Sequence, residues 1–366
     1  MKSIKLEYFL LFILLNLFFS CRGQQSSHKL INIDDTYSTN QIGKVVSKMG
    51  NKITHIFQDS QNNYWFGGEG VYRYDGESIT QFSVNDGLCN NRIRGIQEDE
   101  FGNIYFDTGS GISKYDGQKF ITLQLDTTAS KTDWKMEPGD LWFAGNWNKN
   151  GPYRYDGEKL YHLEFPKHKL EDEYYSRITN KSFSPYEVYQ IFKDNKGNIW
   201  FGTSSFGACR YDGESLSWIS ELDMIEMDYG PAPGVRSILE DKEGNLWFSS
   251  NINHKYKMIP ASSHDKKEYE ILKGIETSKE SDLNNYFMSI TQDDNGYIWM
   301  ARYGGGVWKY DSEELIHYPI KDADTDVLIF KIYKDRQGDL WLGTQNAGTF
   351  KFNGESFERF NPIFKN

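Results

Sequence analysis

The segment Asp194-Asn-Lys-Gly-Asn-Ile-Trp-Phe-Gly-Thr203 decides the fold of this chain, because the same pattern returns six more times along the sequence. Its first four residues predict a tight turn, in which the Asp side chain accepts backbone hydrogen bonds and Gly197 takes a positive φ. The aromatic run that follows predicts a β-strand. The central aromatic residues of the seven copies are Trp65, Tyr105, Trp142, Trp200, Trp247, Trp299 and Trp341.

Each copy extends into four strand-like runs. Around Trp200 these runs cover residues 188–193, 198–203, 207–211 and 215–219, and Asp212-Gly213 predicts a tight hairpin between the last two. Successive copies are 37 to 58 residues apart, and a period of roughly 40–50 residues with four strands per unit is typical of propeller blades. We therefore predict an all-β fold, a seven-bladed β-propeller of four-stranded antiparallel blades.

Two copies depart from the pattern. In the third, residues 134–139 are irregular where the first strand is expected, and Pro138 interrupts backbone pairing. In the fifth, a long loop is expected at 260–268 in place of the Asp-Gly hairpin. Because two copies are irregular, a six-bladed propeller is the alternative prediction.

The composition also limits the partners of the protein. Aromatic residues make up 16% of the 366-residue chain, which contains 33 Gly, and this balance favours strands joined by tight turns. The net charge of −11 is spread along the sequence and would repel nucleic acid, so we expect no nucleic-acid partner.

Cys89 and Cys209 lack further ligands at metal-binding spacing, and the Asp-rich turns lack the bidentate Glu of a calcium loop. We predict two separate free thiols, no metal site and no cofactor.

The N-terminus has the features of a targeting segment. Lys2 and Lys5 precede an apolar run that begins at Phe9 and ends before Ser20-Cys21, an arrangement typical of a signal peptide. The end of the run resembles a bacterial lipobox, and the residues after the Cys are similar to those of Bacteroidota-type lipoproteins. We predict a signal peptide at 1–20, lipidation at Cys21, a tether at 21–52 and the propeller at 53–366. The mature protein is then expected on the outer membrane, facing the periplasm, with the lipid as its membrane anchor.

Three longer stretches resemble a known family. Residues 85–93 followed by 97–103, residues 238–248 and residues 333–344 are similar to the two-component-regulator propeller repeat. The resemblance covers about residues 53–360 and implies the ligand-sensing region of a periplasmic hybrid sensor kinase, often concerned with glycans. The sequence contains one propeller and no kinase, so we expect a stand-alone relative of such sensor domains.

The candidate ligand site lies on the loops between the second and third strands of each blade. These loops carry amides, hydroxyls and aromatic rings, which suit a sugar or a peptide. The partner expected from this mixture is a glycan fragment or an envelope protein. The predicted ligand contacts are Asn146, Trp147, Phe206, His254, Arg302, Tyr303, Gln345 and Asn346.

No catalytic motif accompanies these loops, and no catalytic residue is predicted. The sequence contains neither a Gly-x-Ser-x-Gly elbow nor a His-Glu-x-x-His motif. Glu69 and Glu187 could face the channel mouth, but we interpret both as solvated loop charges. A non-catalytic binding propeller is therefore the leading hypothesis. An envelope lyase or glycoside hydrolase with its site at the channel mouth is the alternative, and a structural scaffold is a third possibility.

Overall fold

The structure is a computed structural model, and it describes residues 42–145, 149–178, 184–220, 234–250, 253–258, 269–275 and 286–362. All of them belong to one compact unit, Ile42–Asn366. The helices of this described part are the short 3-10 helix η1 (Val84–Asp86) and helix α2 (Glu171–Arg177). Its remaining regular structure is antiparallel sheet, so the predicted all-β class and the four-stranded antiparallel sheets are confirmed.

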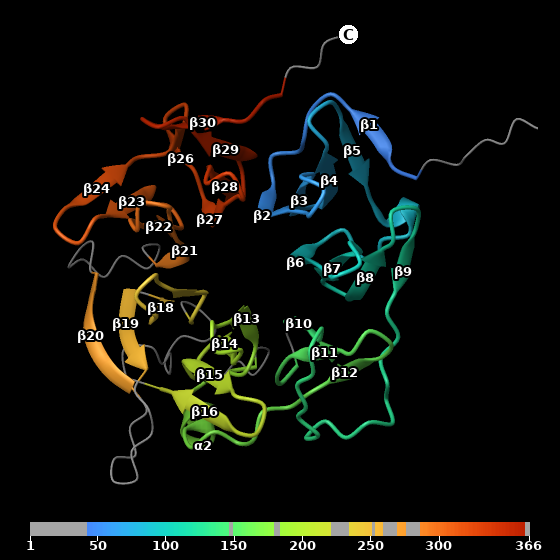
Figure 1. Ribbon diagram of the computed structural model, residues 1–366, viewed down its shortest axis with the longest axis vertical. Helices are drawn as coiled ribbons and strands as arrows, with labels where there is room; N and C mark the ends of the chain where they lie inside the picture. Colours follow the sequence, from blue (N-terminus) through green and yellow to red (C-terminus); the bar gives the residue numbers. More distant parts are fainter. Residues whose placement is uncertain are drawn as a thin grey trace, which may run out of the picture. The chain divides into compact units, whose positions relative to one another are not determined.

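Four sheets contain four strands each, in chain order. They are β6 (Ile93–Glu98), β7 (Ile104–Thr108), β8 (Gly111–Tyr115) and β9 (Phe120–Thr122); β13 (Val188–Lys193), β14 (Ile199–Thr203), β15 (Ala208–Tyr211) and β16 (Leu216–Ile219); β17 (Ser237–Glu240), β18 (Asn245–Ser249), β19 (Asn253–Met258) and β20 (Tyr269–Ile275); and β21 (Phe287–Gln292), β22 (Ile298–Arg302), β23 (Val307–Tyr310) and β24 (Leu315–Tyr318). Figure 1 shows the first strand of a sheet near a common axis and the last strand outermost.

The first and last repeats share one nine-stranded sheet. The first contributes β2 (Ile53–Gln58), β3 (Tyr64–Gly68), β4 (Gly70–Tyr74) and β5 (Ile79–Phe82), and the last contributes β27 (Ile329–Lys334), β28 (Leu340–Thr344), β29 (Thr349–Phe352) and β30 (Phe357–Arg359). A single residue pair, Ile53 with Thr344, joins the two halves. Strand β1 (Lys44–Val46), which falls inside the predicted tether, pairs with β5 on the outer edge.

An Asp-to-aromatic hydrogen bond recurs within the repeats. In the turn before β14, Asp194 Oδ1 accepts the backbone N–H groups of Lys196 and Asn198, and Oδ2 accepts the indole N–H of Trp200 at 2.9 Å. The same bond joins Asp to the aromatic residue six positions later in Asp59–Trp65, Asp99–Tyr105, Asp241–Trp247, Asp293–Trp299 and Asp335–Trp341. This bond explains the fixed spacing in the sequence, because one carboxylate closes the turn and orients the buried ring.

The third repeat lacks this bond, and its sheet has three strands. Met136 stands six residues before Trp142, where the other copies have Asp. Pro138 follows at the position whose N–H the Asp would accept, and proline has no N–H to donate. The sheet consists of β10 (Leu141–Phe143), β11 (Tyr153–Tyr155) and β12 (Leu160–His162). The predicted irregularity is confirmed, and its cause is a pair of residues that cannot form the common turn.

Adjacent repeats are joined by a second recurring contact at the end of the innermost strand. Glu98 accepts the backbone N–H of Ser60 at 2.8 Å, Glu240 that of Asn195 at 2.7 Å, and Gln292 that of Lys242 at 2.8 Å. In each case the acceptor belongs to the following repeat. Gln58 of the first repeat accepts the N–H of Arg336 in the last repeat at 2.9 Å. The first and last repeats therefore meet through the same side-chain contact that joins these three pairs of consecutive repeats.

Replacing Gln58 with Ala tests this junction. The variant loses the bond to Arg336 and a second bond from Gln58 Nε2 to Gln337 Oε1, so we expect the free energy of unfolding to fall by roughly 1–3 kcal/mol. Gln292→Ala is the matched control, because it removes the equivalent contact between consecutive repeats. Urea denaturation should show similar losses for the two variants. A loss confined to Gln292→Ala would mean that the first and last repeats do not depend on each other.

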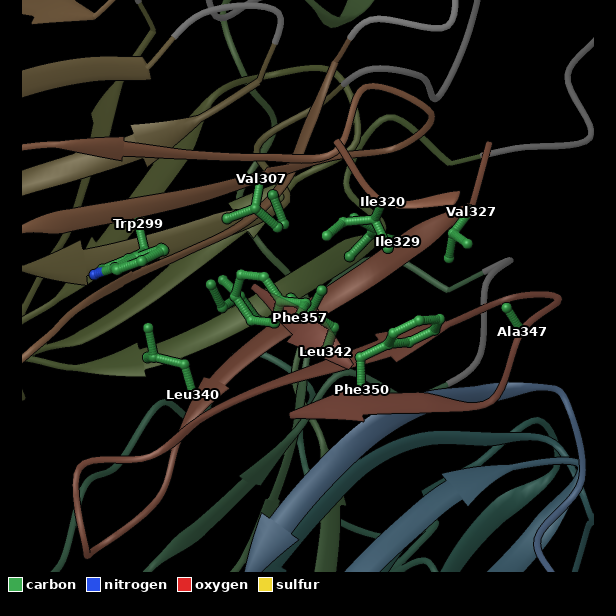
Figure 2. Packing of buried hydrophobic residues seen from close by; sticks show 12 residues of the cluster. Trp299, Val307, Ile320, Val327, Ile329, Leu340, Leu342, Ala347, Phe350 and Phe357 are labelled. Atoms are coloured by element: carbon green, nitrogen blue, oxygen red, sulfur yellow. The ribbon is translucent and has the colours of Figure 1, made fainter. Parts of the chain in front are cut away.

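The repeats also pack face to face through large apolar clusters. Figure 2 shows one of them, where Trp299 and Val307 of one sheet meet Ile329, Leu342 and Phe350 of the next. Ile320 and Val327 lie at the end of this cluster away from Trp299. They flank a two-stranded hairpin of β25 (Lys321–Asp322) and β26 (Thr325–Asp326). Burial of these aromatic and aliphatic side chains supplies most of the stabilisation between sheets.

Among the described residues, no helix has the length and apolar character needed to cross a lipid bilayer. The predicted signal peptide and the lipidation site at Cys21 lie outside the described residues.

Candidate functional site

In five repeats a β-bulge at the start of the innermost strand places the side chain of one residue on a common cavity. The register shifts after the first residue of β2, β6, β13, β21 and β27, which leaves the second residue unpaired. Bulges of this kind re-aim side chains near functional sites. The residues concerned are Thr54, Arg94, Tyr189, Met288 and Phe330, and Arg236, directly before β17, occupies the corresponding place.

These six residues line a single cavity of about 750 Å³. The cavity follows the innermost strands, whose arrangement around the axis Figure 1 shows, and its volume is in the range of small-molecule sites. It is lined further by the residues next along the strands, among them His55, Gln190 and Lys331. The channel mouth, as we use the term below, is the end of this cavity defined by Thr54, Arg94, Tyr189, Arg236, Met288 and Phe330.

A buried ion pair lies at the channel mouth. Arg94 Nη2 is 3.1 Å from Glu187 Oε1, and both side chains are at most one-tenth exposed. Arg94 also donates to the backbone carbonyl of Gly145. Burial raises the pKa of Glu187 to about 7, although the positive charges of Arg94 and Arg236 act in the opposite direction. Glu187 is therefore not the solvated loop charge that the sequence suggested, and that interpretation was wrong.

A second carboxyl group, Asp107, lies close to this pair. Its Oδ2 accepts the N–H of Gly145 at 3.0 Å, whereas its buried Oδ1 has no hydrogen-bond partner. Burial raises the pKa of Asp107 to about 6, against the lowering effect of Arg94. At the equivalent strand position the other repeats have Gly67, Ala144, Gly202, Ser249, Ala301 and Gly343. Asp107 is thus the one acidic residue at a position that is otherwise small.

Two further cations face the cavity. The guanidinium of Arg236 lies 4.3 Å from the Tyr189 ring centroid and 5.3 Å from that of Tyr286. Lys331 lines the wall of the cavity, and burial lowers the pKa of its ammonium. Burial, together with the charges of Lys331 and Arg94, lowers the pKa of His55 to about 3. His55 is therefore neutral at physiological pH.

Aromatic rings form one side of the channel mouth. Tyr286 and Tyr303 stack with ring centroids 5.5 Å apart and an interplanar angle of 12°. Tyr303 meets Phe330 edge-on at 5.6 Å. All three residues line the cavity. Rings held in this way present apolar surface beside polar hydroxyl groups, which is a common property of sites for sugars and other cyclic ligands.

The structure places the predicted contact residues in different surroundings. Tyr303 and Gln345 line the cavity. Phe206 is buried in the core, where it stacks on His168 at 4.5 Å. Arg302 is buried with its guanidinium 5.6 Å from the Phe287 ring centroid. Asn346 is exposed, and its side chain accepts the N–H of Leu328.

His254 belongs to β19, where its backbone lies opposite Phe248, and Asn146 and Trp147 lie outside the described residues. Glu69 is exposed and pairs with Lys52 at 2.9 Å, as expected for a solvated loop charge.

The two remaining cysteines are free thiols. Cys209 is buried in the core, and Cys89 Sγ lies 3.1 Å from Thr108 Oγ1. Within the described ranges no group of three or more His, Cys, Asp or Glu side chains is placed to hold a metal ion.

The sequence contained a signal for part of this site. Asp107 follows the aromatic strand pattern at a position that is small in the other repeats, so aligning the copies would have selected it. The bulge residues also occupy one fixed position; in β2, β6, β13, β21 and β27 it is the second residue of the strand, and the residues there differ in size and charge. The bulge residues vary from copy to copy at a fixed position, whereas the turn residues are nearly the same in every copy, and this difference distinguishes the two sets.

Comparison with known proteins identifies the repeat. Residues 47–70, 182–205, 229–251 and 324–346 match the model of the two component regulator propeller family. These segments include the start of the innermost strands β2 and β13 and the turns that follow them. No curated protein matches the chain.

Solved structures share the fold. The extracellular domain of BT4673 from B. thetaiotaomicron, described as a hybrid two component system, matches with a TM-score of 0.59 at 22% identity, over 88% of this chain and 40% of its own. Virginiamycin B lyase from Staphylococcus aureus matches with a TM-score of 0.61 at 15% identity, over 84% and 97% of the two chains. PorZ of Porphyromonas gingivalis, a surface component of the type-IX secretion system, matches with a TM-score of 0.54 at 13% identity, over 84% and 47%. The fold is therefore a β-propeller, and the chain spans less than half of the BT4673 extracellular domain that it resembles.

Proposed function

Because the chain carries two component regulator propeller repeats, we propose that it is a ligand-binding propeller of the cell envelope. Its binding site is the channel mouth. The single observation that carries this proposal is the bulge, which in five repeats brings a different side chain to one cavity of about 750 Å³. A regular scaffold that presents variable residues at one end is the usual design of a recognition surface.

We also propose that the propeller has seven blades. The sheets that begin with β2, β6, β13, β17, β21 and β27 provide six, and the three-stranded sheet of β10, β11 and β12 provides the seventh. The contact of Gln58 with Arg336 supports direct closure between the first and last blades. A crystal structure that shows six blades, with the third repeat outside the ring, would overturn this count.

For the location, we propose an exported lipoprotein anchored through Cys21 in the outer membrane. The basic and apolar leader before Cys21 supports this location, as does the similarity to an extracellular domain. Metabolic labelling with a radioactive fatty acid should mark the wild type but not Cys21→Ser. Equal labelling of the two would contradict the anchor.

The ligand site can be tested by thermal-shift screening of the mature protein against a panel of oligosaccharides and peptides. A binding compound should raise the melting temperature of the wild type, and this rise should be lost in Tyr303→Ala and Phe330→Ala, whose rings line the cavity. Phe101→Ala is the control, because this ring is 81% exposed in the turn between β6 and β7. A compound that stabilises all four proteins equally would place the site elsewhere.

A catalytic role is the alternative, and a specific observation favours it. Glu187 and Asp107 are buried acids with raised pKa values on the same cavity, and a carboxyl group that titrates near neutral pH is suited to proton transfer. The lyase found among the structural matches also uses this fold. Turnover of a polysaccharide or lactone that disappears in Glu187→Gln and Asp107→Asn would support an enzyme. Binding without turnover would support the ligand-binding role.

A further inference from the structure

One cation of the channel mouth has no ion pair within the described residues. Arg94 is paired with Glu187 and Lys52 with Glu69. Arg236 also lines the cavity, but no carboxylate of the described part of the chain forms an ion pair with it. Glu187 acts on Arg236 electrostatically, yet its hydrogen bond goes to Arg94. The cavity therefore contains a guanidinium that no carboxylate of the described residues contacts directly.

Arg236 is held in place by aromatic contacts. Its guanidinium stacks at 4.3 Å on Tyr189 and lies 5.3 Å from Tyr286, while its buried Nε has no hydrogen-bond partner. Buried donors without a partner are rare in folded proteins and call for an explanation. A guanidinium stacked between rings keeps the donors along its edge available, in a planar fork that matches the two oxygens of a carboxylate or sulfate.

The same residues lead to the aromatic side of the channel mouth. Tyr286, which borders Arg236, stacks on Tyr303, and Tyr303 contacts Phe330. Lys331 follows Phe330 in the sequence and adds a second positive charge to the cavity wall, with no ion pair among the described residues. The guanidinium of Arg236 is thus continuous with a set of ring faces. The lining of the cavity contains six Lys and Arg residues against four Asp and Glu residues, in a chain of net charge −11.

We propose that the channel mouth binds an acidic saccharide, with its carboxylate or sulfate on the guanidinium of Arg236 and a sugar ring on Tyr303 and Phe330. This assignment rests on the proposed function of the channel mouth as a ligand site. Neutral saccharides leave the half-buried guanidinium of Arg236 without its partner, so they bind more weakly. Discrimination arises at Arg236 because a site built for a charged group rejects the ligand that lacks it.

Isothermal titration calorimetry of the mature protein tests the assignment. Three probes are compared: a galacturonic acid trisaccharide, the neutral galactose trisaccharide and a sulfated galactose trisaccharide. We expect at least one acidic probe to bind about tenfold or more tightly than the neutral one, and the bound anion to be displaced by inorganic sulfate. The carboxylated and sulfated arms show which acidic group the site prefers.

Variants separate the role of Arg236 from general electrostatics. Arg236→Gln should weaken binding of the acidic probe by about tenfold or more, and Arg236→Lys should restore only part of it, because Lys lacks the planar fork. Arg359→Gln, an exposed residue of β30 outside the cavity, should leave binding unchanged. Should the Arg236 variants fail to fold, loss of wild-type binding in the presence of sulfate still tests the anion site.

Two different failures are distinguishable. If the neutral probe binds as well as the acidic ones and Arg236→Gln has no effect, the acidic-saccharide assignment is wrong while the channel mouth remains a ligand site. If no saccharide binds and screening finds no other ligand that depends on Tyr303, the proposed function itself fails.

Discussion

Arg94→Met is expected to lower the free energy of unfolding by roughly 3–5 kcal/mol at pH 8, because it leaves the buried carboxylate of Glu187 without its hydrogen-bonded partner. Asp107 loses the positive charge that holds its pKa down. At pH 5.5 the expected loss is smaller, since both acids take up protons instead of remaining charged. Urea denaturation at the two pH values measures this difference.

The wild type should itself become less stable as the pH rises. The pKa of Glu187 is raised from 4.5 to about 7, and that of Asp107 from 3.8 to about 6. The stability that each group contributes is full below its ordinary pKa and is lost as the pH rises through the folded value. Each contributes at most about 1.4 kcal/mol per pH unit in its window.

A double variant controls for lost packing. Arg94→Met combined with Glu187→Met removes both charges and should recover most of the stability at pH 8, because apolar replacement of a buried pair is often neutral or favourable. If the double variant is as unstable as Arg94→Met alone, the ion pair is not the reason for the loss.

Trp341→Ala should be the most damaging single change at the junction of the last and first repeats, with an expected loss of roughly 3–5 kcal/mol. Trp341 is 2% exposed, and its ring packs on Tyr64 and Phe360 at 4.9 Å. The indole N–H and the Tyr64 hydroxyl both donate to Asp335 Oδ2, at 2.8 Å and 2.7 Å. The substitution therefore removes a core ring and one of the two side-chain donors of a buried carboxylate.

Trp341→Phe separates these two effects. It keeps most of the apolar volume but removes the indole N–H, so a loss of roughly 1–3 kcal/mol is expected. Guanidinium denaturation followed by circular dichroism should rank the wild type above Trp341→Phe, and Trp341→Phe above Trp341→Ala. A Phe variant as unstable as the Ala variant would show that the hydrogen bond to Asp335, rather than ring packing, dominates.

Local chemistry made much of the fold predictable. Asp194, Gly197 and Trp200 act within one turn and one strand, so their spacing is visible in the sequence and recurs wherever the turn forms. The irregular third repeat was predictable for the same reason, because Pro138 cannot donate a backbone hydrogen bond. Strand β1 was not predicted, because its pairing with β5 depends on a contact between segments more than 30 residues apart.

The candidate site was less predictable, because it depends on contacts between repeats. Arg94 and Glu187 are 93 residues apart in sequence, and only the fold brings them together. Phe206 was placed on the surface by its loop position, but the neighbouring segment with His168 covers it. Asp107 was the exception, since an acid at an otherwise small position could have been recognised in an alignment of the seven copies.

The contact of Gln58 with Arg336 has a consequence for how such propellers evolve. The junction between the first and last repeats uses the same hydrogen bond, from a turn N–H to a Gln side chain, as Gln292 with Lys242. This part of the interface that closes the ring therefore needs no residue types of its own. Duplication or deletion of a whole repeat in a gene would preserve this contact wherever the following repeat has Gln or Glu at the end of its innermost strand, as the first, second, fifth and sixth repeats do. The number of repeats can then change between relatives without a new type of contact at the closure of the ring. The angle at which adjacent sheets pack still limits how many repeats fit.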